Sequence, residues 1–217
     1  MLDDTPAPPE PRLNAAGFQK ITGASDAAVA DLQRYRERLE AGAAVMNLVG
    51  PATLPDFWRR HALDSAQLEL MAPEARVWAD LGSGAGLPGV VLAILLKGRD
   101  GAKVHLVDSL KKRTRFLQEV VQALELPAEV HDARAESLAF PVDVVTARAL
   151  APLPRLLGWA EPWLRQGATG LFLKGESVED ELNEARRTWR LDADLLPSLS
   201  DPRGRILRVR SLKRAHG

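Results

Sequence analysis

The chain contains no cysteine, which excludes disulfide bonds, metal sites built from thiolates and catalysis by a cysteine nucleophile. No apolar run approaches the roughly 20 residues that a membrane-spanning helix needs. The first residues also lack the charged start and the apolar stretch of a signal peptide. From these absences we expect a cytoplasmic protein that has no membrane anchor and no metal site.

A net charge is also missing, because 29 Lys and Arg residues balance 29 Asp and Glu residues. This balance argues against a protein that coats nucleic acid by charge alone. The charges are nevertheless unevenly distributed. The last fifteen residues contain no acid but carry Arg203, Arg205, Arg208, Arg210, Lys213 and Arg214. This end of the chain is therefore a candidate contact for phosphate groups.

The length and composition favour one folded domain with an extension. The chain has 217 residues, of which 46% are hydrophobic and 27% are charged, as is typical of soluble globular proteins. A single α/β domain of this size already buries most of its apolar surface. We therefore expect one active site, and we expect a monomer.

The N-terminal third is predicted to contain a tail and two helices. Residues 1–22 begin with closely spaced prolines and few large apolar side chains, so they are predicted to form a mobile tail. Residues 23–72 are predicted to form a small helical extension. Its first helix follows Ser25, and its second begins at Thr53, where Thr53 and Asp56 form a capping-box arrangement.

Residues 73–217 alternate short apolar runs with helical patterns, which indicates βαβ units and a mostly parallel sheet. The predicted strands are 76–81, 103–108, 128–131, 142–147, 170–174 and 205–210. The predicted helices are 88–96, 111–124, 153–164 and 178–190. Ligands of open α/β sheets bind outside the carboxyl ends of the strands. The functional residues are therefore expected at those ends.

The segment from Ala79 to Gly89 reads ADLGSGAGLPG and joins an apolar strand to a predicted helix. Glycines at such a turn let the backbone approach a ligand and adopt positive φ angles. Gly82, Gly84 and Gly86 are therefore candidate cofactor contacts. The cofactor is either the S-adenosylmethionine of a methyltransferase or the dinucleotide of an oxidoreductase, because the loop also satisfies the GxGxxG pattern.

Charged residues at the predicted strand ends extend this candidate site. The carboxylate of Asp80 would repel a pyrophosphate but not the ammonium and sulfonium of S-adenosylmethionine, which favours the methyltransferase. Asp108 ends the next strand and is expected to accept the ribose hydroxyls. Glu136 follows the third strand, where the adenine would lie, and Arg148 follows the fourth at the cofactor cleft. A solvated acid at a helix start and a structural ion pair are the alternatives for Glu136 and Arg148.

At these residues the chain resembles a bacterial 16S rRNA guanine-N7 methyltransferase family, glucose-inhibited division protein B or ribosomal RNA small subunit methyltransferase G. The similar segments are Asn47-Leu48, Arg60-His61-Ala62-Leu63-Asp64-Ser65, Asp80 to Gly89, Leu106 to Arg113, Thr146-Ala147-Arg148-Ala149 and Leu173-Lys174-Gly175. The Gly-Leu-Pro-Gly and Asp-Ser-Leu parts are more specific than a glycine loop. The chain departs from the family at Val49, where Thr is usual, and the basic C-terminal strand is not part of the family signature.

The resemblance implies a class I S-adenosylmethionine-dependent methyltransferase. Its fold would be α/β and Rossmann-like, with a mostly parallel seven-stranded sheet in residues 73–217 preceded by the helical extension. The implied cofactor is S-adenosylmethionine, and the implied substrate is the 16S rRNA of the small ribosomal subunit. The resemblance implies cofactor contacts at Gly82, Leu87, Ala135, Glu136 and Arg148.

Guanine N7 carries an in-plane lone pair and no proton, so its methylation needs neither a general base nor a covalent intermediate. Proximity and orientation should then carry most of the catalysis. The absent residues agree with this target, because C5 methylation of pyrimidines uses a cysteine thiolate. The chain also lacks the Asn/Asp-Pro-Pro-aromatic segment that amino methyltransferases carry after the fourth strand. His61 and Arg148 are the candidate catalytic residues.

Helical spacing predicts that Asp64 pairs with Arg60 or orients His61. This group either docks the N-terminal helices on the sheet or covers the substrate base. The candidate contacts for RNA phosphates are Arg60, Lys111, Lys112, Arg113, Arg208 and Arg210. A solvated basic face is the alternative for them. The rival functions are methylation of another RNA or a small molecule, dinucleotide-dependent oxidoreduction, and RNA binding without catalysis.

Overall fold

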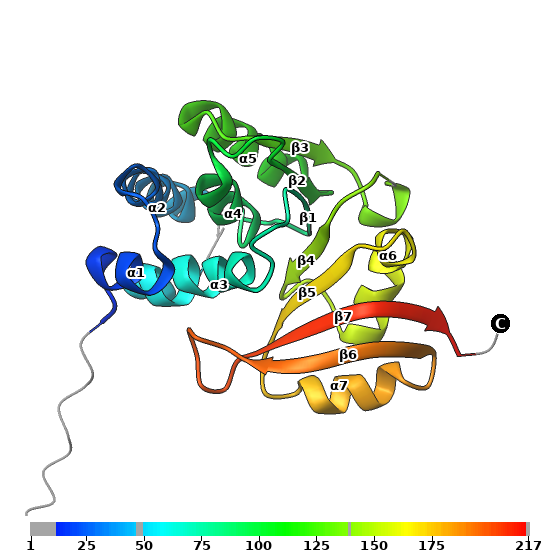
Figure 1. Cartoon of the computed structure of the whole chain (residues 1–217). Coiled ribbons are helices and arrows are strands. Elements are labelled where there is room, and N and C mark those ends of the chain that lie inside the picture. The colour runs from blue at the N-terminus through cyan, green and yellow to red at the C-terminus, as the bar shows by residue number, and fades with distance from the viewer. Residues whose placement is uncertain (1–11, 47–49, 139, 216–217) are drawn as a thin grey trace, which may run out of the picture.

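The computed structural model describes residues 12–46, 50–138 and 140–215 (Figure 1). Its centre is a seven-stranded sheet in the order β3-β2-β1-β4-β5-β7-β6. The strands are β1 (Val77–Leu81), β2 (Lys103–Asp108), β3 (Ala128–Asp132), β4 (Val144–Arg148), β5 (Thr169–Lys174), β6 (Trp189–Pro197) and β7 (Arg205–Arg214). The α-helices are α1 (Ala15–Thr22), α2 (Asp26–Met46), α3 (Asp64–Met71), α4 (Gly89–Leu96), α5 (Lys111–Leu124), α6 (Leu153–Arg165) and α7 (Val178–Ala185). Shorter turns lie at Pro51–Asp56, Trp58–Leu63 and Ala135–Ser137.

The strands from β1 to β5 are parallel, whereas β7 runs antiparallel to both β5 and β6. The predicted mostly parallel sheet is therefore confirmed. Parallel strands need crossover connections, and helices α4, α5 and α6 supply them between consecutive strands. All the parallel strands thus end at one edge of the sheet, next to the loops that lead into these helices.

Alternating side chains of the strands build a core on each face of the sheet. Val104 and Leu106 pack with α1 to α5 on one face. Ala79, Leu81 and Val107 pack with α6 and α7 on the other face. Figure 1 shows this division, with α1 to α5 grouped on one side of the sheet and α6 and α7 on the other.

The boundary of the N-terminal extension differs from the prediction. Residues 15–22, which were assigned to the mobile tail, form α1 with Asn14 as N-cap, and Asn14 Oδ1 accepts the Gly17 amide at 2.9 Å. The reason is Phe18, whose side chain is fully buried and lies 5.4 Å from the Trp58 ring, centre to centre. Residues 1–11 of the predicted tail lie outside the described residues.

The C-terminal part also differs from the prediction. The helix predicted at 178–190 ends at Ala185, and a strand that was not predicted, β6, begins at Trp189. The alternation of buried and exposed side chains in β6 is weak because the strand lies at the sheet edge. Trp189 is its one buried residue. Strand β7 therefore lies inside the sheet and is not an edge. Among the described residues, no helix is long and apolar enough to cross a membrane.

Candidate active site

The glycine loop between β1 and α4 satisfies most of its own backbone amides. The amides that donate to acceptors within the protein are those of Ser83, Gly84, Gly86, Leu87, Gly89 and Val90. Pro88 has no amide hydrogen. Loops that bind phosphate do the opposite, because they leave such amides pointing at the ligand. This loop is therefore poorly suited to the pyrophosphate of a dinucleotide.

Asp80, which was predicted to be a cofactor contact, lies beneath this loop. Its side chain is fully buried, and its Oδ2 accepts the Gly89 amide at the start of α4 at 3.0 Å. Burial raises the pKa of Asp80 to about 7, against the opposing effect of its hydrogen bonds. A carboxyl group of the protein thus occupies the helix N-terminus where a dinucleotide would place its pyrophosphate. Asp80 still disfavours a dinucleotide, but by occupying that position.

A pocket of about 340 Å³ lies at the carboxyl ends of β1, β2 and β3, and we call it the Gly82 pocket. The predicted cofactor residues that line it are Gly82, Asp108, Ala135 and Glu136. The predicted residues that do not line it are Asp80, Gly84, Gly86, Leu87 and Arg148. Gly86 instead serves packing, because a Cβ there would overlap Val90. The residues Leu150, Arg155 and Trp159, which were not predicted, close the other side.

The Asp108 carboxylate is held in place by backbone amides on both sides. Its Oδ1 accepts the Leu110 amide and its Oδ2 accepts the Gly84 amide, each at 2.9 Å. Arg113 Nη1 lies 3.5 Å from Oδ2. A carboxylate has about four lone-pair positions, so both oxygens keep the capacity to accept a hydroxyl from the pocket. The contact to ribose hydroxyls stays a prediction.

A second and larger cavity of about 960 Å³ lies at the carboxyl ends of β4 and β5, and we call it the Arg148 cleft. Leu150 lines both the cleft and the Gly82 pocket. Its side chain lies directly against Gly82, where any Cβ would overlap it. The two cavities therefore adjoin at Leu150, which requires glycine at position 82.

Arg148 lies at the centre of a polar cluster beside this cleft. Its Nη1 donates to the Arg60 carbonyl at 3.1 Å and to Asp64 Oδ2 at 3.3 Å. Asp64 Oδ1 in turn accepts from Ser200 Oγ at 2.6 Å. The predicted pairing is thus corrected, because Asp64 pairs with Arg148 and the exposed Arg60 contributes its carbonyl. Parallel strand β4 delivers Arg148 to this point, which helical spacing alone could not reveal.

Both ring nitrogens of His61 have partners in the same cluster. Nδ1 lies 3.4 Å from Arg148 Nη2, and Nε2 lies 2.9 Å from Thr53 Oγ1. Burial, followed by the charges of Arg148 and Arg60, lowers the pKa of His61 to about 4. Thr53 lies inside a 3-10 helix, Pro51–Asp56, whose N-cap is Gly50, and its hydroxyl donates to the Gly50 carbonyl at 2.7 Å, so it is not the helix start that was predicted. A neutral imidazole held at both nitrogens is suited to positioning neighbours.

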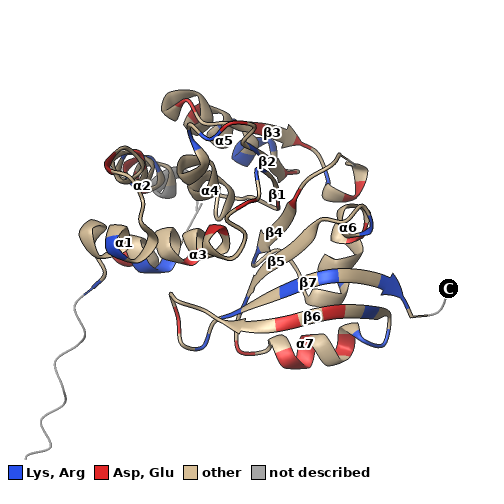
Figure 2. Cartoon of the chain, viewed as in Figure 1, with Lys and Arg blue, Asp and Glu red and all other residues tan. Residues whose placement is uncertain are grey.

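Apart from Arg60, which lies in the Arg148 cluster described above, the predicted phosphate contacts fall on two different surfaces. On β7, Arg208 pairs with Asp194 at 2.6 Å, and Arg210 pairs with Asp192 at 2.8 Å and with Asp194. Figure 2 shows these basic residues of β7 beside the acidic residues of β6. The β6 acids, on a strand that was not predicted, thus balance the charge expected to attract RNA. The other predicted contacts, Lys111, Lys112 and Arg113, form the exposed first turn of α5.

Sequence reasoning missed two further features of the site. The Tyr35 hydroxyl of α2 donates to the Ala85 carbonyl at 2.8 Å and so ties the N-terminal extension to the glycine loop. The mostly buried Lys174 pairs with Glu181 at 2.6 Å in the wall of the Arg148 cleft. The only sequence signal was a lysine at a strand end and a tyrosine on an apolar helix face. Asn47 and Leu48 of the similar segments lie outside the described residues.

Comparison with known proteins identifies the family. The family model for rRNA small subunit methyltransferase G matches residues 28–202. A ribosomal RNA small subunit methyltransferase G from Caulobacter vibrioides is 60% identical over 214 residues, which cover 99% of each chain. One from Parvibaculum lavamentivorans is 47% identical and covers 92% of this chain and 90% of its own. This chain belongs to the rRNA small subunit methyltransferase G family.

Solved structures support the class I methyltransferase fold of this family member. The O-methyltransferase TomG from Streptomyces achromogenes, in complex with SAM, has a TM-score of 0.57 at 15% identity, covering 91% of this chain and 95% of its own. A methyltransferase from Geobacter sulfurreducens has a TM-score of 0.55 at 13% identity, covering 93% and 98%. The predicted fold class is therefore confirmed.

Proposed function

We propose that this chain is a monomeric cytoplasmic enzyme that transfers a methyl group from S-adenosylmethionine to N7 of a guanine in bacterial 16S rRNA. One observation carries the proposal beyond family membership. The Gly82 pocket and the Arg148 cleft share Leu150, so a methyl donor in the pocket and an RNA base in the cleft would be neighbours. Proximity of this kind is the main requirement for a reaction that needs no base.

The residues of the Gly82 pocket fit S-adenosylmethionine. Asp108 presents a fixed carboxylate for the ribose hydroxyls, and Glu136 and Trp159 offer an acceptor and an aromatic face farther along the pocket. Gly82 has φ of 65° and keeps its backbone free of a side chain next to Leu150. The internal bonding of the loop amides suits a cofactor without phosphate. When bound, S-adenosylmethionine supplies the electrophilic methyl group of its sulfonium.

The cluster around Arg148 is proposed to position the substrate base. Arg148 cannot remove a proton, because a guanidinium stays charged at all ordinary pH values. The low pKa of His61 keeps the ring neutral at pH 7, and both of its nitrogens are already engaged. Neither residue is therefore assigned as a general base. Asp64 and His61 orient Arg148, and Arg148 presents its remaining N–H groups to the cleft.

The proposal is tested by methyl transfer. Tritiated S-adenosylmethionine is incubated with this protein and small ribosomal subunits purified from a strain that lacks the enzyme, and the modified nucleotide is mapped. One N7-methylguanine in 16S rRNA is the expected product. Comparing methyl transfer to assembled subunits with methyl transfer to protein-free rRNA shows which of the two is the substrate. Label in another RNA or another atom would replace the proposal with the rival methyltransferase function, and tight NAD binding without methyl transfer would replace it with an oxidoreductase.

A further inference from the structure

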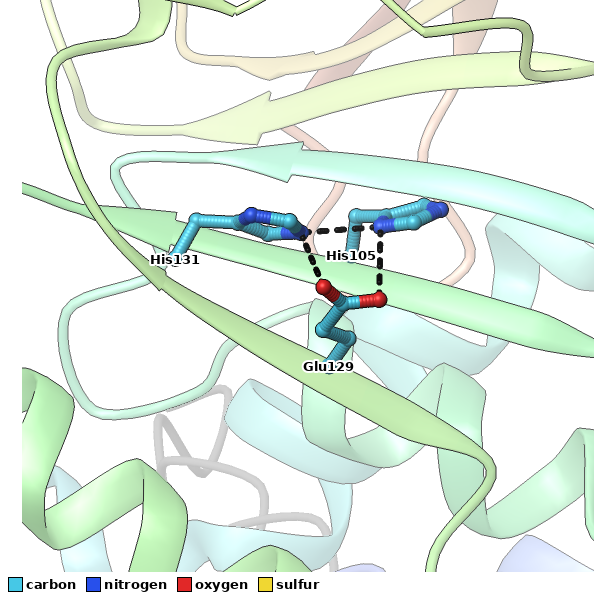
Figure 3. Close-up of side chains that lie close together, drawn as sticks. All are labelled: His105, Glu129 and His131. Carbon is cyan, nitrogen blue, oxygen red and sulfur yellow. Dashed lines mark hydrogen bonds and ion pairs between the residues drawn. The ribbon is translucent and has the colours of Figure 1, made fainter.

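Two histidines and a glutamate lie together on β2 and β3, away from the Gly82 pocket and the Arg148 cleft. His105 is on β2, and Glu129 and His131 are two residues apart on β3. The period of two places Glu129 and His131 on the same face of β3. The parallel register pairs His105 with Glu129, so all three side chains point to one face of the sheet, as Figure 3 shows.

The potential ligand atoms of this cluster converge. His105 Nδ1 and His131 Nε2 are 2.9 Å apart, and Glu129 oxygens lie 4.0 Å from the first nitrogen and 3.9 Å from the second. Zinc binds imidazole nitrogen at about 2.0 to 2.1 Å and carboxylate oxygen at about 2.0 to 2.2 Å. Two ligands of one tetrahedral ion are then separated by roughly 3.3 Å. The nitrogens need to move apart and the carboxylate inward by less than 1 Å, within the range of side-chain rotation.

The surroundings of the cluster favour neutral imidazoles. Burial, followed by the His131 and Lys103 charges, lowers the pKa of His105 to about 4, and burial lowers the pKa of His131. Neutral rings have the lone pairs that a metal needs. In the short contact between the two rings, one of the two facing nitrogens carries a proton. If that proton moves to the other nitrogen of the same ring, both facing nitrogens present lone pairs and both rings stay neutral.

Neighbouring side chains would support a bound cation. The Phe140 ring lies 4.1 Å from the His105 ring and 5.2 Å from the His131 ring, centre to centre, and holds both imidazoles in place. Lys103 Nζ pairs with Glu129 Oε2 at 2.6 Å and orients the carboxylate, whereas Oε1, which lies 3.9 Å from His131 Nε2, is the oxygen left to bind the cation. The Glu129 side chain is half exposed, which leaves an entry path and room for a water as fourth ligand.

We propose that His105, Glu129 and His131 form a binding site for a divalent zinc ion. The donor set of two imidazoles and one carboxylate matches zinc and not magnesium, which prefers oxygen ligands alone. This proposal departs from the expectation that the protein has no metal site, which rested on the absence of cysteine. The site bridges β2 and β3 below Asp108 and Asp132, so zinc would brace the two strands whose ends form the Gly82 pocket.

The test is a titration of the full chain, stripped with a chelator, with Zn²⁺ alone. We expect one equivalent to bind and Mg²⁺ not to bind. The variant His131→Asn removes one ligand and should weaken Zn²⁺ binding by roughly 100-fold. Even residues that only hydrogen-bond to a ligand contribute about 10- to 100-fold to metal affinity. Glu129→Gln tests the exposed ligand, and Glu125→Gln, which changes an exposed acid just after α5, is its matched control.

Nitrogen-15 spectra of the unmodified protein keep the proposal testable even if a histidine variant does not fold. Zn²⁺ should shift His105 Nδ1 and His131 Nε2, while the signals of His61 stay in place. The variant His216→Asn should bind Zn²⁺ as the unmodified protein does. Absence of binding, unshifted cluster nitrogens, or binding lost in His216→Asn but kept in His131→Asn would overturn the proposal.

Discussion

The loop after β1 and the cleft beyond β4 and β5 lie at the same edge of the sheet but are built in opposite ways. Most backbone amides of the loop donate hydrogen bonds to acceptors within the protein, and the loop covers the buried Asp80. It has no room for a Cβ at Gly86 or Gly89. The cleft is larger and its lining includes charged side chains, among them Arg148, whose hydrogen-bond partners are Arg60, His61 and Asp64. The comparison indicates that the cofactor side is fixed before binding, whereas the substrate side keeps polar groups available.

The largest effect is expected from filling the loop. Gly86 has φ of 99°, and a Cβ there would overlap Val90. Gly86→Ala should therefore lower the free energy of unfolding by about 3 to 5 kcal/mol, from overpacking together with a strained backbone. Urea unfolding measures the loss. The control is Gly175→Ala in the cleft, where a Cβ meets no atom within 4 Å; equal losses in both variants would remove the contrast between the two regions.

Asp80→Asn should change how the stability of the protein depends on pH, because it removes the ionisable carboxyl group buried beneath the loop. Burial raises the pKa of Asp80 from its ordinary value of about 3.8 to about 7 in the folded protein. Folding therefore takes up a proton between these values, and the carboxyl group lowers stability as the pH rises through this window. An amide keeps the acceptor for Gly89 but cannot ionise, so the variant should gain roughly 2 to 4 kcal/mol relative to the unmodified protein between pH 4 and pH 8. Parallel curves of stability against pH would show that Asp80 is not perturbed.

Arg148→Gln tests the substrate side of the comparison. Removing one charged donor from an active site costs about 10² to 10³ in rate, so we expect roughly a 100-fold fall in methyl transfer. The affinity for S-adenosylhomocysteine, measured by calorimetry, should hardly change, because Arg148 does not line the Gly82 pocket. A large loss of that affinity with an unaltered rate would instead assign Arg148 to cofactor binding, the role that the family resemblance implies.

Asp108→Ala tests the cofactor side of the comparison. If both carboxylate oxygens accept ribose hydroxyls, calorimetry should show a loss of about 1.5 to 3 kcal/mol in affinity for S-adenosylhomocysteine. Asp108→Asn keeps one acceptor and should lose less. Because Asp108 also accepts the Gly84 and Leu110 amides, thermal unfolding of both variants must be followed. Unaltered affinity in a folded Asp108→Ala variant would remove this residue from the cofactor site.

The smallest effect is expected on the face of β7. The sequence alone predicted that Arg208 and Arg210 bind phosphates, but Asp192 and Asp194 already pair with them. The double variant with Gln at 208 and 210 should therefore leave RNA binding and its salt dependence nearly unchanged. Methylation rates at subsaturating substrate across a salt series measure both. A flatter salt dependence in the double variant would mean that phosphates displace the β6 acids.

The sequence by itself determined the features that depend on local pattern. The ADLGSGAGLPG segment indicated a ligand-binding loop, and the apolar runs predicted six strands of the sheet near their observed positions. Gly82, Asp108, Ala135 and Glu136 could be named because strand ends of a parallel sheet share one edge. The family could be named because its similar segments extend along most of the chain.

The tertiary structure alone decided which partner each polar group meets. Asp80 bonds to Gly89, Asp64 pairs with Arg148 across 84 residues, and the β7 arginines pair with a strand that the sequence did not reveal. Residues 15–22 carry local helix signals at both ends, the Asn14 N-cap and the Gly23 C-cap, but this short helix is also buried through Phe18, which packs against Trp58. The physical reason is common to all of these cases. Burial and charge pairing depend on the three-dimensional neighbours of a side chain, and local periodicity contains no information about those neighbours.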